Sequence, residues 1–385
     1  MWRCTILTLA PSQTVPQAGV DMLGSASRCV VGLCAVLTSM EAHAAPNELQ
    51  RMEQAIEQRV SRGEFMGAVL VARGGKPVLD RGYGKASLEW GILNSPATRF
   101  RLGSITKQFT AASILLLEER GILKTDDRIK KYLPDAPAAW DQISIFNLLT
   151  HTSGIPDLTA FPDFEASEAL PTTPERTVAR FREKPLEFEP GTKFAYSNSG
   201  YILLGYLLEK ITGETYQDFV QKNIFDRLGM KNSGYDSSTE VIPHHAEGYT
   251  PKGGKVLVAG YVNMSLPFSA GGLYSTTEDL LLWEEGLYGG KLLSPESVKK
   301  MTTPFLGDPA KDYAFGVVVT YAPNGAKTVW HSGSIEGFDA CMVYGFADRL
   351  AVIVLSNLNG DAARQLSDEL RMIARNEGTP TDVGR

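Results

Sequence analysis

The sequence predicts an α+β protein, in which an antiparallel sheet built from both chain ends is flanked by helices and carries an inserted, mainly helical lobe. Three observations lead to this fold class. Short apolar runs typical of strands occur near both ends, helical segments broken by Pro- and Gly-containing loops fill the middle, and a polar helix closes the fold. With 385 residues, 43% of them hydrophobic, the chain is long enough for one large domain or two lobes.

The N-terminal part of the sheet is predicted from a helix followed by a hairpin. A helical opening over Asn47–Arg62 leads into an apolar run, Gly67–Ala72, that is typical of a strand. Gly74 and Gly75 then turn the chain, and Pro77–Leu79 begins the partner strand. These elements predict a β-hairpin at this end of the sheet.

The C-terminal part supplies the other strands. Four are expected, over Phe315–Thr320, Thr328–His331, Asp339–Tyr344 and Leu350–Ser356. The last is almost entirely apolar, which is typical of a central strand buried on both faces. A polar helix from about Asp361 to Arg375 is expected to close the fold.

The middle of the chain predicts the inserted lobe. Helical segments are expected over Ile145–Thr150, Gly200–Thr212 and Tyr216–Leu228, and Leu170–Pro174 is typical of a solvated connector. We therefore expect an α/β lobe of residues 45–128 and 265–378, an inserted helical lobe of residues 129–264, and a disordered tail of residues 379–385. A cleft between the lobes is the expected place for a substrate.

Residues 1–44 are predicted to be a leader that contains a signal peptide. Arg28 precedes an apolar run, Cys29–Met40, and Ala42-His43-Ala44 provides small residues at the positions that a signal peptidase checks. Twelve apolar residues are too few to span a bilayer, so no stable membrane anchor is expected. Cleavage before Ala45 would leave a periplasmic or secreted protein.

Charge and cysteine content narrow the function further. The net charge of −6 and the absence of a long basic run argue against a nucleic-acid partner. Cys341 is the one cysteine of the expected mature chain, so it has no partner for an internal disulfide and is expected to be a small buried side chain. Neither the net charge nor the cysteine content indicates the oligomeric state.

A serine and a lysine lie one helical turn apart at the start of an expected amphipathic helix. Ser104 would begin this helix, and Lys107 would lie on the same face. A serine hydroxyl is a poor nucleophile until a base takes its proton, and a lysine does this only when burial or nearby charge keeps it neutral. The helix N-terminus also offers backbone N–H groups to a developing oxyanion.

The order of the motifs identifies which copy matters. Ser-x-x-Lys occurs again at Ser297–Lys300, and Tyr-x-Asn occurs at both Tyr196–Asn198 and Tyr261–Asn263. A single match of either pattern therefore carries little weight. Ser104 is followed by a Tyr-x-Asn and then by His331–Ser334 on a predicted strand, whereas Ser297 has no Tyr-x-Asn after it.

These motifs resemble the three motifs of class C β-lactamases and their relatives, which include DD-peptidases, D-amino-acid peptidases and family VIII carboxylesterases. Residues 148–154 (LLTHTSG) and 270–275 (AGGLYS) are also similar to stretches of that group, and the resemblance extends from about residue 50 to 375. It implies a β-lactamase/transpeptidase-like fold and a penicillin-recognising serine hydrolase. By this resemblance Ser104 forms the acyl-enzyme, Lys107 and Tyr196 shuttle its proton, and Asn198 holds Lys107 and the substrate amide.

The third motif departs from the β-lactamase pattern. The resemblance implies that the N–H groups of Ser104 and Ser334 form the oxyanion hole and that Gly333 lets the substrate lie close to the strand. His331 stands where β-lactamases of this class usually carry lysine, and some peptidases of the group carry histidine. A histidine with an ordinary pKa near 6.5 is mostly neutral at pH 7, which favours a peptidase or an esterase over an efficient β-lactamase. If protonated His331 binds a substrate carboxylate, activity on such substrates should fall around pH 6 to 7.5.

We therefore expect an acyl-transfer hydrolase that cleaves small amide or ester bonds in a small molecule or short peptide. No cofactor or metal is implied, because the sequence has no Gly-x-Ser-x-Gly elbow, His-Glu-x-x-His motif or phosphate loop, and His244-His245 lacks accompanying ligands. Two alternatives stay open: a short-chain carboxylesterase, and a penicillin-binding sensor that is acylated without turning over.

Overall fold

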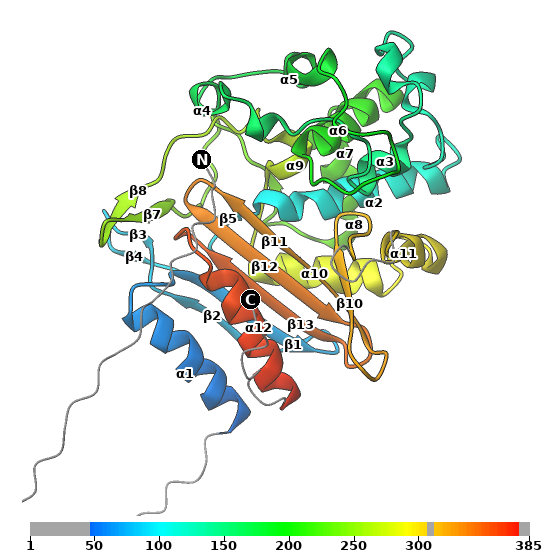
Figure 1. Cartoon of the computed structure of the whole chain (residues 1–385). Coiled ribbons are helices and arrows are strands. Elements are labelled where there is room, and N and C mark those ends of the chain that lie inside the picture. Colours follow the sequence, from blue (N-terminus) through cyan, green and yellow to red (C-terminus); the bar gives the residue numbers. More distant parts are fainter. Residues whose placement is uncertain (1–46, 306–311, 377–385) are drawn as a thin grey trace, which may run out of the picture. The chain divides into compact units, whose positions relative to one another are not determined.

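A six-stranded antiparallel sheet joins the two ends of the chain (Figure 1). Its strand order is β10-β11-β12-β13-β1-β2, so a strand from the C-terminal part pairs directly with one from the N-terminal part. The strands are β1 (Gly67–Arg73), β2 (Lys76–Tyr83), β10 (Val318–Tyr321), β11 (Lys327–Ile335), β12 (Phe338–Gly345) and β13 (Leu350–Ser356). The predicted antiparallel sheet built from both chain ends is confirmed, and β13 is central as expected.

The computed structural model describes residues 47–305 and 312–376. The predicted leader, its cleavage site and the tail of residues 379–385 lie outside the described residues. Within the described part of the chain, no helix combines the length and the apolar character that crossing a membrane requires.

The central strands β1, β12 and β13 are almost entirely buried on both faces, whereas the edge strand β2 is largely exposed. Val352 and Val354 belong to a core against α1 (Glu48–Ser61) and α12 (Ala362–Arg375), whereas Ile353 and Leu355 belong to the core on the other face. Cys341 lies in the first of these cores and is a buried free thiol, as expected.

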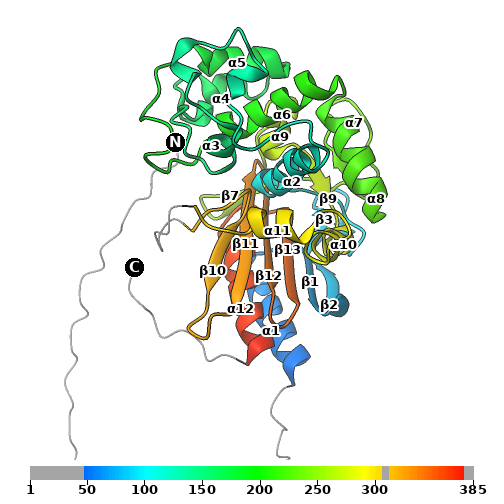
Figure 2. The same cartoon turned by 90° about the vertical axis from the view of Figure 1, so that its right-hand side faces the viewer.

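The remaining helices cover the second face and gather beyond one end of the sheet (Figures 1 and 2). They are α2 (Thr106–Glu119), α3 (Ile145–Leu149), α4 (Phe164–Ser167), α5 (Pro174–Arg182), α6 (Asn198–Thr212), α7 (Tyr216–Val220), α8 (Asp226–Leu228), α9 (Phe268–Gly271), α10 (Thr277–Tyr288) and α11 (Pro295–Met301). The expected helix over residues 216–228 is interrupted, because a π-helical turn, Gln221–Phe225, separates α7 from α8.

The structure also contains short strands that the sequence did not predict, some of them in the middle of the chain. Three small sheets pair β3 (Lys85–Ser87) with β4 (Ile92–Leu93), β5 (Phe100–Arg101) and β6 (Gly234–Tyr235) with β9 (Leu273–Ser275), and β7 (Tyr249–Lys252) with β8 (Lys255–Val258). Through β6 and β9, the middle segment is tied to the strand that precedes the Ser104 turn.

The helix after Ser104 is not amphipathic, contrary to expectation. Every residue of α2 from Thr106 to Leu117 is buried, and only the last two residues of the helix are exposed or partly exposed. The reason is that the helix lies between the sheet and the helices of the middle segment (Figure 2). Polar side chains on it are satisfied internally: Gln108 accepts from the Trp283 indole at 3.1 Å, and Thr110 donates to the Ser269 carbonyl at 2.7 Å.

The strand expected over Phe315–Thr320 begins later, at Val318. Gly316 has a φ of 71°, and a Cβ at this position would lie 2.7 Å from the Lys107 carbonyl oxygen. The chain therefore makes a tight turn over the start of α2 before it can become extended.

Candidate active site

Ser104 lies in a 3₁₀ turn, Gly103–Ile105, that leads directly into α2. Two hydrogen bonds to Leu273 on β9 hold this turn: the Leu102 N–H donates to the Leu273 carbonyl at 2.9 Å, and the Leu273 N–H donates to Thr106 Oγ1 at 3.2 Å. The nucleophile candidate is thus positioned by a neighbouring strand as well as by its own helix.

Two glycines let the turn approach β11 at backbone distance. A Cβ on Gly333 would lie 1.9 Å from the Leu102 carbonyl oxygen, and a Cβ on Gly103, whose φ is 51°, would lie 2.8 Å from the Ser334 nitrogen. No side chain fits at either position. The approach brings the backbone of Ser104 next to that of Ser334, the pair expected to supply the oxyanion hole.

Lys107 is fully buried and its amine contacts three oxygens. Nζ lies 3.0 Å from Ser104 Oγ, 2.8 Å from Asn198 Oδ1 and 2.9 Å from the Ala270 carbonyl oxygen. The last two can only accept hydrogen bonds, so they take the two N–H bonds of a neutral amine. The remaining lone pair then faces the Ser104 hydroxyl, which is the arrangement a general base requires.

Burial also keeps this amine close to neutrality. Desolvation lowers the pKa of Lys107 from 10.5 to about 7, and the nearby Asp157 carboxylate partly opposes the shift. A substantial fraction of the lysine is therefore uncharged at neutral pH. Lys107 therefore meets the condition given above for a lysine base, which is that burial keeps the amine neutral.

The Tyr196-Ser197-Asn198 segment enters α6 and is anchored from both sides. The Ser197 side chain caps α6 by accepting from the Gly200 N–H at 3.3 Å, and the Ser197 N–H donates to His151 Nδ1 at 3.0 Å. His151 is buried with its ring 4.2 Å from the Tyr196 ring between centroids. Its burial lowers the pKa of His151 well below 6.5. The His151 ring is therefore neutral and packs against the Tyr196 ring.

Asp157 is a site residue that the sequence reasoning missed. Its carboxylate accepts from the Asn198 N–H at 3.0 Å and from Asn198 Nδ2 at 3.2 Å. These bonds assign the amide so that Oδ1 faces Lys107. Asp157 follows the LLTHTSG stretch by three residues, but this spacing does not indicate a contact with Asn198.

Replacing Asp157 with asparagine should change the pH profile as well as the rate. Without the carboxylate charge, burial lowers the pKa of Lys107 further, so the rising limb of kcat/KM should move to lower pH by about one unit. The plateau should drop about tenfold, because Asn198 loses a charge-assisted partner. Measuring kcat/KM against pH on a neutral ester tests this. Asp163→Asn is the control, because it removes an exposed carboxylate that is paired with Arg180. A rising limb that stays at the same pH in D157N would contradict the effect assigned to Asp157 on the pKa of Lys107.

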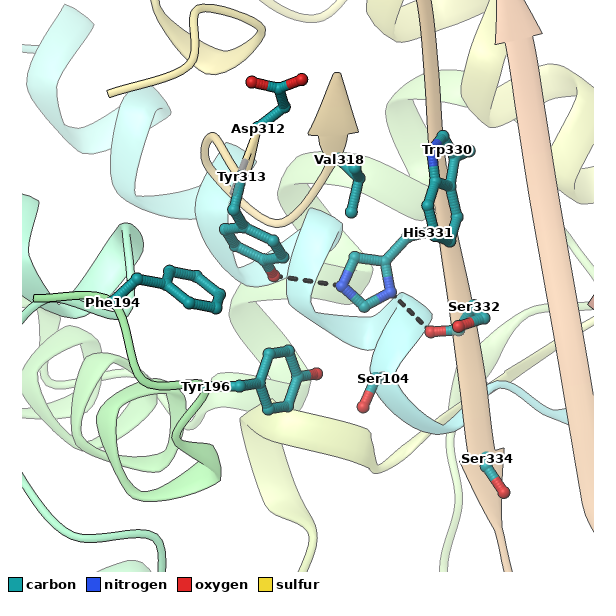
Figure 3. A pocket seen from close by; sticks show the side chains of 10 residues that line it. All are labelled: Ser104, Phe194, Tyr196, Asp312, Tyr313, Val318, Trp330, His331, Ser332 and Ser334. Atoms are coloured by element: carbon teal, nitrogen blue, oxygen red, sulfur yellow. Dashed lines mark hydrogen bonds between the residues drawn. The ribbon is translucent and has the colours of Figure 1, made fainter. Parts of the chain in front are cut away.

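The Tyr196 hydroxyl points toward Ser104 (Figure 3). One edge of the ring is open, with 37% of the residue exposed, but burial of the hydroxyl end raises the pKa of Tyr196 above its usual value, and a hydrogen bond with Ser104 opposes this in part. Lys107 Nζ lies 4.8 Å from the ring centroid. Tyr196 is therefore a neutral phenol, suited to donate a proton rather than to take the first one.

His331 is buried and both of its ring nitrogens are engaged. Nδ1 lies 2.5 Å from the Ser332 carbonyl oxygen, which can only accept, so Nδ1 carries the hydrogen. Nε2 then accepts from the Tyr313 hydroxyl at 3.1 Å. Burial, with a contribution from nearby Lys107, lowers the pKa of His331 to about 4. Desolvation penalises the charged ring and therefore places the titration of His331 below the range of pH 6 to 7.5 that an ordinary histidine would give.

A pocket of about 470 Å³ opens beside Ser104. Figure 3 shows its lining side chains, which come from the loop before α6, the segment before β10, and β11. They are Ser104, Phe194, Tyr196, Asp312, Tyr313, Val318, Trp330, His331, Ser332 and Ser334. The sequence reasoning missed the aromatic residues Phe194, Tyr313 and Trp330, because no motif spacing distinguishes them from core aromatics.

The duplicate motifs lie elsewhere. Ser297 is in α11, where its N–H donates to the capping Ser294 hydroxyl, and Tyr261 is 58% exposed in a loop. Neither residue lines the pocket, so the choice of Ser104 and Tyr196 agrees with the geometry. His245 packs against Phe338 and Tyr274, and among the described residues no three metal-binding side chains form a cluster.

The fold and this arrangement of serine, lysine and tyrosine define a serine hydrolase. The chain belongs to the beta-lactamase family, whose model matches residues 52–376.

Known proteins agree with this assignment. A Bacillus subtilis (strain 168) protein described as penicillin-binding protein PbpX is 32% identical over 298 residues, which cover 77% of this chain and 72% of that protein. The octameric penicillin-binding protein homologue from Pyrococcus abyssi is 28% identical with a TM-score of 0.75, covering 86% of this chain and 78% of that one. A D-stereospecific amidohydrolase from Streptomyces sp. is 27% identical with a TM-score of 0.70, covering 84% and 98%. The predicted β-lactamase-like fold is confirmed.

Proposed function

We propose that this protein hydrolyses small amide or ester bonds through an acyl-enzyme formed on Ser104. The observation that carries the proposal is the buried Lys107 amine, whose two N–H bonds are taken by Asn198 and Ala270 so that its lone pair faces the Ser104 hydroxyl. The similarity to a D-stereospecific amidohydrolase supports an amide as well as an ester substrate.

The reaction begins with proton transfer from Ser104 Oγ to Lys107 Nζ as Oγ attacks the substrate carbonyl carbon. The oxyanion is stabilised by the N–H groups of Ser104 and Ser334. Tyr196 gives its proton to the leaving atom and recovers one from the Lys107 ammonium. The carbon–leaving-group bond breaks, and a water molecule then hydrolyses the acyl-enzyme by the same relay.

The test is to incubate the protein with a nitrophenyl ester, a cephalosporin and a D-Ala-D-Ala peptide, and to compare kcat/KM. Intact-mass measurement during turnover should show an acyl adduct on Ser104. Linear steady-state release of product supports a hydrolase, whereas one burst equal to the enzyme concentration would identify the penicillin-binding sensor instead. No adduct and no turnover with any of the three would contradict the proposal.

We also propose that the protein is exported and cut before Ala45. Arg28, the apolar run Cys29–Met40 and Ala42-His43-Ala44 support this. Intact-mass analysis of a periplasmic or culture fraction should find a chain that begins at Ala45. A full-length product confined to the cytoplasm would contradict export.

A further inference from the structure

The proton relay decides which part of a substrate enters the pocket. When the acyl-enzyme forms, the departing oxygen or nitrogen must receive a proton, and Tyr196 is the neutral hydroxyl that faces Ser104. The leaving group therefore lies on the Tyr196 side of Ser104. Phe194, Tyr313 and His331 line the pocket on that side, and Ser334 lies on the opposite side (Figure 3).

The walls of this pocket are aromatic. The Tyr313 ring lies 5.7 Å from the Phe194 ring and meets the Tyr196 ring edge-on at 6.1 Å between centroids. Trp330 and Val318, which are paired across β11 and β10, also border the pocket, although the Trp330 ring packs against the Arg364 guanidinium of α12. An aromatic ring bound here can therefore form edge-to-face or offset-stacked contacts with these side chains.

The described part of this pocket offers no cation to a carboxylate. Among the described residues that line it there is no lysine or arginine, and Asp312 is acidic. His331 has its one N–H bonded to the Ser332 carbonyl and its other nitrogen bonded to Tyr313, so it has no hydrogen to donate to a ligand. Lys107 contacts Ser104 from the core and its N–H bonds are taken by Asn198 and Ala270. Burial lowers the pKa of His331 to about 4, so the ring gains no charge near neutral pH.

We propose that the leaving group of the substrate is an uncharged aromatic alcohol or amine, without the carboxylate that a D-Ala-D-Ala peptide or a β-lactam would place in this pocket. The inference rests on the proposed acyl-enzyme function and specifies its substrate class. For a benzyl ester, the bond between Ser104 Oγ and the acyl carbon forms as the Ser104 proton passes to Lys107. The bond between the acyl carbon and the benzyloxy oxygen breaks, and benzyl alcohol leaves with a proton from Tyr196.

Three esters of one acyl group separate charge from aromaticity: benzyl butanoate, 4-carboxybenzyl butanoate and cyclohexylmethyl butanoate. We expect kcat/KM for the benzyl ester to exceed that for the carboxybenzyl ester by about tenfold to a hundredfold, because the carboxylate loses water without gaining a cation as partner. The benzyl ester should exceed the cyclohexylmethyl ester by about threefold to tenfold.

A matched pair of variants tests whether the lack of a cation among the described lining residues causes the preference for an uncharged leaving group. Val318 lines the pocket but leaves the His331–Tyr313 hydrogen bond untouched, so V318K adds a charge and V318Q adds similar bulk without one. V318K should raise the ratio of carboxybenzyl to benzyl turnover about tenfold over V318Q. Equal kcat/KM for the three esters, a preference for the carboxybenzyl ester in the natural protein, or equal ratios in V318K and V318Q would overturn the inference while the acyl-enzyme function stood. No turnover and no Ser104 adduct with any ester would overturn both.

Discussion

Ser104→Ala should reduce ester and amide hydrolysis by about four to six orders of magnitude and abolish the acyl adduct seen by intact mass. The reason is geometric: Ser104 Oγ is the hydroxyl that meets the Lys107 amine at 3.0 Å and faces the Tyr196 phenol. Removing the oxygen leaves no atom to attack the carbonyl carbon. The fold should survive, because Ser104 is partly exposed and the turn is held through Leu102 and Thr106.

Ser297→Ala is the matched control, because Ser297 begins the other Ser-x-x-Lys pattern. It lies in α11 against Ser294 and does not line the pocket, so its removal should leave kcat/KM within about twofold. Thermal unfolding of both variants separates loss of chemistry from loss of fold. More than a few per cent of residual activity in S104A, or a matching loss in S297A, would show that another group is the nucleophile.

Lys107→Met should lower kcat/KM by about two to four orders of magnitude, the usual contribution of a general base. Methionine fills a similar volume, so the buried site stays packed while the lone pair facing Ser104 is removed. Arginine at this position should be equally inactive, because a guanidinium stays charged and cannot accept the serine proton.

The pH profile of the natural protein is the second half of this prediction. The active form has neutral Lys107, whose pKa burial lowers to about 7, so kcat/KM on a neutral ester should rise about tenfold per unit at lower pH and level off above about pH 7. In K107M this limb should be absent. His331 should add no limb near neutrality, because its pKa lies at about 4. A limb that persists in K107M would assign the base to a different group.

The amino-acid sequence by itself determined the fold class and the choice of candidate reacting residues. Strand periodicity needs only neighbouring residues, so β1 and β13 could be predicted to within a residue, and the apolar run Leu350–Leu355 placed β13 at the centre of the sheet. The order of the motifs selected Ser104 over Ser297, and the resemblance to class C β-lactamases and their relatives selected Tyr196 over Tyr261.

Electrostatics and pocket shape were decided only by the tertiary structure. The pKa of Lys107 depends on burial by Ala270 and its neighbours and on the Asp157 charge, contacts across 50 to 163 positions of sequence that no local pattern encodes. From the sequence alone, His331 is expected to have the ordinary histidine pKa near 6.5. Packing against Tyr313 makes it a neutral, fully bonded ring, which supports the proposed uncharged leaving group. Local sequence specifies which atoms can react, and long-range packing sets their charge and what they can accommodate.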